Sequence, residues 1–68
     1  MKISARNQLS GTVKEVSLGT ITAQVILDIG NGQQIVAIIS KDSAESLNLK
    51  AGVKATAVIK ATEVMIMN

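Results

Sequence analysis

The side chains with the most chemistry to offer are cationic and hydroxyl donors, and they occur in three separate stretches of the chain. They are Ser4 and Arg6 near the start, Ser40 and Ser43 in the middle, and Lys60 with the backbone amides of Ala61 and Thr62 near the end. Arg6 is the only arginine, and a guanidinium presents its N–H donors in a fixed fork that suits oxyanions. Together these groups favour the binding of a small anion.

Each of these groups also has an ordinary structural explanation when it is taken singly. Lys60 is then a solvated strand end, Ser40 or Asp42 a helix cap, and Arg6 an exposed charge at a sheet edge. The sequence alone does not show whether the fold brings the three stretches together.

The remaining polar residues give little indication of an enzyme. The chain has no His and no Cys, which removes thiolate nucleophiles and the usual ligands of zinc. Its carboxylates show no spacing typical of a general acid–base pair; they are Glu15, Asp28, Asp42, Glu45 and Glu63. We therefore expect no catalytic residues, no direct ligands for a metal cation, and a protein that is not an enzyme.

Composition also bears on partners and location. Proteins that bind single-stranded nucleic acid combine aromatic stacking platforms with a basic groove, whereas this chain has no aromatic residue and a net charge of +2. It has no apolar stretch close to the ~20 residues of a membrane helix. The start of the chain also lacks the apolar core of a signal peptide. These features predict a soluble, cytoplasmic protein that binds neither nucleic acid nor membrane.

Alternation of apolar and polar residues predicts a chain made mainly of strands. We expect strands over residues 3–16, 20–29, 34–40, 54–60 and 64–67, a short helix over residues 41–49, and a turn over residues 61–63. Within the second strand, one face carries Ile21, Ala23, Val25, Leu27 and Ile29.

Local residue types predict how these elements begin and end. Gly11 suggests a bend or bulge in the first strand. Residues 15–19 should form the first hairpin turn, in which Gly19 is free to take positive φ, and residues 30–32 (Gly-Asn-Gly) should form a type I′ hairpin turn. Asp42 is expected to cap the helix in a capping box with Glu45, and Gly52 to end the segment.

Self-association is expected because the chain is short and one strand is apolar on both faces. With 68 residues and no cysteine, a single domain over residues 1–68 is marginal as a monomer. The third strand has a continuous apolar run over residues 35–39, which requires cover on both faces. The second cover is either another subunit or the chain's own helix.

The order of elements indicates the fold class. Three strands, a short helix and two further strands match the all-β, five-stranded OB-like Greek-key barrel, with the helix between strands three and four. Because such barrels often bind nucleic acids, a small OB-fold nucleic-acid-binding protein is the alternative function, although the missing aromatic residues speak against it.

Several motifs together resemble the molbindins, the Mop domain family of small molybdate- and tungstate-binding proteins, in its single-Mop form. The matching positions are residues 4–8 (Ser-Ala-Arg-Asn-Gln), Leu9, Gly11, residues 38–40 (Ile-Ile-Ser), Ser43, residues 47–49 (Leu-Asn-Leu), Gly52 and residues 58–66 (Val-Ile-Lys-Ala-Thr-Glu-Val-Met-Ile). The resemblance covers the whole chain.

The resemblance implies a homohexamer, built as a trimer of dimers, that holds molybdate or tungstate between subunits for intracellular molybdenum storage, transport or homeostasis. Carried over by position, the oxyanion-binding residues are Ser4, Arg6, Ser40, Ser43, Lys60 and Ala61. The family also has a second kind of site, for which Asn7 and Gln8 are the candidates here.

The chemistry of the anion agrees with this implication. Molybdate is a tetrahedral dianion that carries no proton at neutral pH, so its pocket should present donors rather than acceptors. Phosphate keeps a proton part of the time, and a pocket without a carboxylate disfavours that form. Sulfate is likewise unprotonated, so only pocket size can exclude it, and tungstate should bind as molybdate does.

Overall fold

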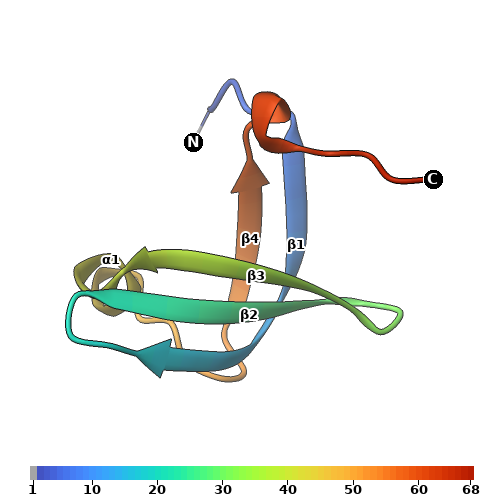
Figure 1. Cartoon of the computed structure of the whole chain (residues 1–68). Helices are drawn as coiled ribbons and strands as arrows, with labels where there is room; N and C mark the ends of the chain where they lie inside the picture. Colours follow the sequence, from blue (N-terminus) through green and yellow to red (C-terminus); the bar gives the residue numbers. More distant parts are fainter. Residues whose placement is uncertain (1) are drawn as a thin grey trace.

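The computed structural model describes residues 2–68, which form one antiparallel sheet with a short helix beside it (Figure 1). The strands lie in the order β3-β2-β1-β4. The elements are β1 (Asn7–Leu18), β2 (Thr22–Gly30), β3 (Gln33–Ser40), α1 (Lys41–Ser46), β4 (Lys54–Ile59) and the 3₁₀ helix η1 (Ala61–Glu63). The predicted all-β, OB-like class is confirmed in this coarse form.

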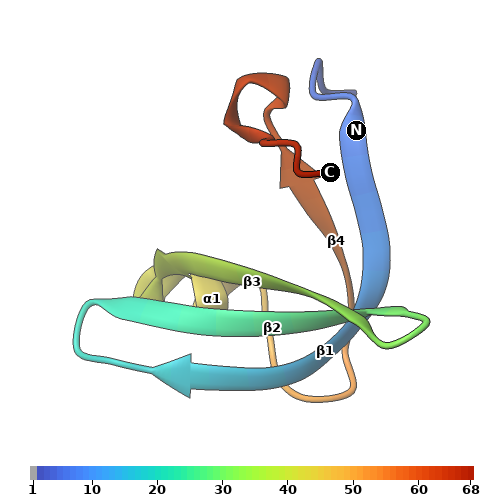
Figure 2. The same cartoon turned by 45° about the vertical axis from the view of Figure 1, so that its right-hand side comes forward.

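The long strand β1 joins two parts of the sheet. Its first half, from Asn7 to Thr12, pairs with β4, and its second half, from Thr12 to Leu18, pairs with β2. Figure 2 shows how β1 curves between the two parts, so that the sheet forms a half-barrel. The curvature brings Gly11 against the next strand, where a Cβ would overlap the carbonyl oxygen of Asp28. The irregularity in pairing falls slightly later, between Val13 and Glu15.

The core lies inside the curve of β1, β2 and β3. Val13, Val25 and Leu27 are buried at its centre, and half-buried aliphatic residues from the other elements surround them. The alternation predicted for the second strand is confirmed at Ala23, Val25 and Leu27, which are all buried. It is wrong at Ile21, which is 77% exposed because the strand begins only at Thr22 and Ile21 lies in the preceding turn.

The two hairpins differ in how well the sequence predicts them. Asn31 and Gly32 take φ of 54° and 74°, as the type I′ prediction for residues 30–32 requires. The first turn lies later than predicted, since β1 continues to Leu18 and the turn is closed by the amide of Gly19 donating to the Thr22 carbonyl at 2.8 Å. Gly19 does not take positive φ.

Helix α1 is shorter than predicted, and a different residue caps it. Ser40, not Asp42, is the N-cap: its Oγ accepts a hydrogen bond from the Ser43 amide at 3.0 Å. A serine one residue before the helix reaches this amide, whereas Asp42 already lies inside the first turn. The helix ends at Ser46, after which Asn48 takes φ of 54° and so turns the chain away well before Gly52.

The predicted fifth strand is wrong for a single chain. Residues 64–68 pair with no strand, and Figure 1 shows this tail running away from the sheet. Met65, Ile66 and Met67 are 92%, 89% and 95% exposed. Their apolar, strand-like sequence therefore has no surface of its own chain to cover.

Strand β3 is covered on one face only. Ile35, Ala37 and Ile39 are half-buried toward the core, whereas Val36 and Ile38 are 59% and 64% exposed. Helix α1 does not cover these two side chains, so the prediction that the chain's own helix supplies the second cover is wrong. The prediction of a second subunit there stays a prediction.

Candidate anion-binding site

Strand pairing brings the first and third donor stretches together. Asn7, the first residue of β1, pairs with Ile59, the last residue of β4. Arg6 directly precedes Asn7 and Lys60 directly follows Ile59. Both cationic residues therefore lie just beyond the paired strands at the same end of the sheet, which is at the top in Figures 1 and 2. Residues far apart in the sequence thus become neighbours because two strands are antiparallel partners.

Two side-chain hydrogen bonds fix the backbone at this end. The Asn7 Nδ2 donates to the Ile59 carbonyl at 3.2 Å, which ties the start of β1 to the end of β4. The Gln8 Nε2 donates to the Ala5 carbonyl at 2.9 Å, within the segment that carries Ser4 and Arg6. Both backbone segments that lead to the donors are therefore held in place.

The 3₁₀ helix η1 presents backbone amides beside Lys60. Within this turn the Glu63 amide donates to the Lys60 carbonyl at 2.9 Å and the Val64 amide to the Ala61 carbonyl at 3.3 Å. The first amides of any helical turn have no partner inside it, and here they are those of Ala61 and Thr62. Two adjacent backbone amides without a partner in the turn, next to a cationic residue, are donors that suit an anion.

Ser40 and Ser43 lie elsewhere in the fold. They sit where β3 passes into α1, with Ser40 paired to Thr22. Both views of the molecule place α1 apart from the start of β1 and the end of β4 (Figures 1 and 2). The single chain therefore brings the segments that carry Ser4, Arg6, Lys60 and Ala61 to one end of the sheet, whereas Ser40 and Ser43 lie in another part of the fold.

The serine pair is itself ordered by hydrogen bonds. Ser40 Oγ donates to Ser43 Oγ at 2.8 Å while it accepts from the Ser43 amide. Since a hydroxyl has a single proton, Ser43 keeps its own proton for another acceptor. The Lys41 amide donates to the Ile21 carbonyl at 2.7 Å, so the start of the helix has fewer free amides than the sequence suggests.

All the predicted donor residues are exposed in the single chain. They are Ser4, Arg6, Ser40, Ser43, Lys60 and Ala61. An anion held only by exposed groups would be screened by water and salt, and its binding would be weak. The second site predicted for Asn7 and Gln8 stays a prediction. In this structure the side-chain nitrogen of each residue donates one hydrogen bond to a backbone carbonyl.

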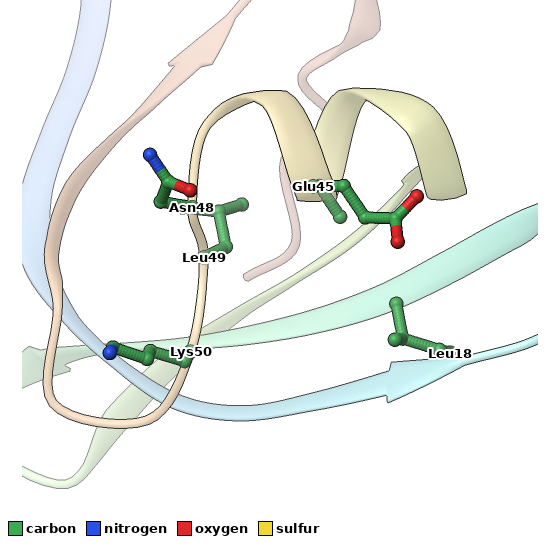
Figure 3. Close-up of a pocket in the computed structure, with 6 residues that line it drawn as sticks. Leu18, Glu45, Asn48, Leu49 and Lys50 are labelled. Carbon is green, nitrogen blue, oxygen red and sulfur yellow. The ribbon is translucent and has the colours of Figure 1, made fainter.

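One hollow of the surface lies away from this end of the molecule. It lies between α1 and the end of β1, and Figure 3 shows the side chains that line it. Leu18 and Leu49 supply apolar walls, while Glu45 and Lys50 provide one charge of each sign. An apolar hollow with a carboxylate at its rim does not suit a dianion, and it contains none of the predicted donors.

Residues 2–68 were also compared with the usual features of metal-binding and membrane-spanning proteins. This part of the chain has no group of three or more His, Cys, Asp and Glu side chains that could hold a metal ion. It also has no helix that is long and apolar enough to cross a membrane.

Comparison with known proteins identifies the family. The model of the TOBE domain matches residues 3–66. The chain is 55% identical over 67 residues to "Molybdenum-pterin-binding protein 1" of Clostridium pasteurianum, with 98% of each chain covered. The chain therefore belongs to the TOBE domain family, and its resemblance to the Mop proteins is confirmed.

Solved structures agree with this assignment. A molybdate-binding protein from Sporomusa ovata superposes with a TM-score of 0.92 at 46% identity, with both chains fully covered. The cytoplasmic molybdate-binding protein ModG, in a form with molybdate bound, superposes with a TM-score of 0.86 at 43% identity over 90% of this chain and 43% of ModG. These relatives do not favour the nucleic-acid-binding alternative.

Proposed function

We propose that this protein binds molybdate, and tungstate in the same way, without catalysing a reaction on it. The observation that carries the proposal is the pairing of Asn7 with Ile59, which sets Arg6 beside Lys60 and the amides of η1. The names of its relatives, which are molybdate- and molybdenum-pterin-binding proteins, supply the identity of the anion.

The donor set matches a fully ionised tetrahedral anion. Arg6 and Lys60 supply positive charge, Ser4 a hydroxyl, and Ala61 and Thr62 backbone amides, all of which donate hydrogen bonds. Glu63 is the only carboxylate in the η1 turn. Bonds to a charged acceptor are about twice as strong as neutral ones, so a few of them suffice for specific binding.

The site is proposed to be completed by a second chain. Ser40 and Ser43 lie away from Arg6 and Lys60, so they reach the same anion only if they come from another subunit. Burial between subunits also removes the screening that weakens binding by exposed groups. The proposed assembly is a homohexamer, a trimer of dimers.

Two apolar surfaces support self-association. The outer face of β3 exposes Val36 and Ile38, and the tail of residues 64–67 exposes Met65, Ile66 and Met67. Strand β3 is at one edge of the sheet and β4 at the other, so both edges have unpaired backbone groups. We propose that the tail adds a strand to such an edge of a partner, which supplies the fifth strand that a single chain lacks.

We propose a storage role because molybdate binding and the assembly of subunits would depend on each other. A ligand that binds only the assembled state stabilises it by about 2.7 kcal/mol when its free concentration is a hundred times Kd. Assembly and loading then rise together with molybdate. We place this buffering role in the cytoplasm, where the relative ModG is described.

The anion alone, rather than a pterin carrying it, is the proposed ligand. The relative's name includes a pterin, whose flat ring system proteins commonly hold against aromatic side chains. This chain has no Phe, Tyr or Trp. The donors at the start of β1 and the end of β4 suit a compact oxyanion instead.

Calorimetric titration of the purified protein tests the proposal. We expect saturable binding of molybdate and of tungstate, with each competing for the other's sites, and much weaker binding of sulfate and phosphate. Sulfate is the decisive control because it carries the same charge and differs in size. Absence of molybdate binding at micromolar protein, or equal affinity for sulfate, would sink the proposed function.

A further inference from the structure

From the hydrogen bonds at the start of β1 and the end of β4 we infer that Asn7 and Gln8 are positioning residues, which fix the two halves of the anion site rather than bind an anion of their own. The inference rests on the proposed function of that site. It replaces the predicted second-site role of these two residues with a different one.

Asn7 acts on the half of the site that contains Lys60. Its side chain is half-buried, and its Nδ2 donates to the Ile59 carbonyl at 3.2 Å. The Ile59 carbonyl belongs to the peptide bond that leads into Lys60. Fixing that peptide fixes the direction in which the chain enters η1, and with it the amides of Ala61 and Thr62.

Gln8 acts on the half that contains Arg6. Its Nε2 donates to the Ala5 carbonyl at 2.9 Å, and Ala5 lies between Ser4 and Arg6. Residues 2–6 are outside the sheet, so no strand pairing holds this segment. The Gln8 bond therefore closes a small loop and restricts the backbone that carries both donors.

The orientation of both carboxamides follows from their partners. A backbone carbonyl can only accept, so the nitrogen of each side chain must face it. The carboxamide oxygen is turned toward the other side, where it is an acceptor. Each bond commits one of the two hydrogens of the carboxamide nitrogen to the backbone, and on that ground we assign these two side chains a positioning role.

The expected effect is a loss of affinity without a loss of sites. A neutral hydrogen bond contributes about 0.5–1.5 kcal/mol, which corresponds to a weakening of about 2- to 13-fold. We expect Gln8→Ala and Asn7→Ala each to weaken molybdate binding by such a factor. The number of molybdate ions bound per chain should not change.

A matched control is available on the same pair of strands. Ser10 Oγ and Thr56 Oγ1 form a hydrogen bond of 3.1 Å between β1 and β4, farther from the site. Ser10→Ala also removes one hydrogen bond between a side chain and the neighbouring strand. It should change the urea midpoint about as much as Asn7→Ala does, because the Asn7 bond also joins β1 to β4, while affinity stays within about twofold of the wild type.

Calorimetric titration with molybdate, done on the wild type and the three variants, is the test. A reduced number of ions per chain in the Asn7 or Gln8 variants would make these residues ligands and overturn the inference. So would unchanged affinity, or an equal loss in Ser10→Ala. If the wild type itself fails to bind, the proposed function is wrong, which is a different outcome from any of these.

Backbone NMR relaxation of the ligand-free protein tests the positioning role independently of binding. In Gln8→Ala the order parameters of residues 4–6 should fall, and in Asn7→Ala those of residues 60–62 should fall. Order parameters equal to those of the wild type in both variants would overturn the inference even if affinity changes.

Discussion

The two ends of the molecule differ in how far a single chain completes them. At the end formed by β2, β3 and the second half of β1, the side chains of Val13, Val25 and Leu27 are buried against one another. At the end formed by β4, η1 and the first half of β1, the donors of the anion site and the apolar tail are exposed. The first end is stabilised within the chain, whereas the second presents groups that need partners.

Because of this difference, we expect residues at the core end to determine stability and residues at the donor end to determine anion binding. Changes at the core end should act on folding, because burial of aliphatic side chains is the main stabilising contribution in so small a domain. Changes at the donor end should act on anion affinity and leave folding almost unchanged, because exposed charges contribute little to stability.

The largest expected effect is at the core end. Leu27 is 5% exposed, and Leu27→Ala should lower the free energy of unfolding by about 2–5 kcal/mol through loss of burial and the cavity that remains. Urea denaturation at fixed protein concentration measures it. Leu47, which is 63% exposed, is the matched control, and Leu47→Ala should change stability by less than about 0.5 kcal/mol. Equal losses would contradict the placement of the core.

At the donor end, Arg6→Ala should mainly change affinity. Loss of a charged donor costs about 1.5–3 kcal/mol per site, or a weakening of about 10- to 150-fold in molybdate binding. Lys54→Ala is the control, because it removes an exposed charge at the opposite end of β4 from Lys60. Titration of both variants checks the prediction, and unchanged affinity in Arg6→Ala would remove Arg6 from the site.

Substitutions of Ser40 and Ser43 should have smaller effects than Arg6→Ala. The first should change stability and the second should change molybdate affinity. Ser40→Ala removes the helix cap and should lower stability by about 0.5–2 kcal/mol. Ser43→Ala keeps the cap, because the Ser43 backbone amide still donates to Ser40 Oγ, and it should weaken molybdate binding with little change in the urea midpoint. If Ser43→Ala lowers stability as much as Ser40→Ala and leaves affinity unchanged, the pair is only a cap.

Much of the fold can be predicted from residue patterns within one chain. The alternation from Ala23 to Leu27 and the turn at Asn31 and Gly32 follow from local preferences of backbone and side chain, and both are confirmed. The helix cap is harder to place, since Ser40 and Asp42 are both good caps and geometry decides between them.

The rest depends on contacts that no local pattern contains. The sequence of residues 64–67 is typical of a strand, but a strand needs an edge to pair with, and the single chain does not bring one to it. Likewise, the sequence identifies Asn7 and Gln8 as polar neighbours of Arg6, but only the folded backbone shows which carbonyls their nitrogen atoms reach.

Native mass spectrometry of the protein with and without molybdate tests the central claim most directly, because it counts chains and anions in the same particle. The claim is that the donor end is completed by a second chain together with the anion. We expect molybdate to be found only on oligomers, with six chains in the loaded particle. A stable monomer that carries molybdate would contradict the account.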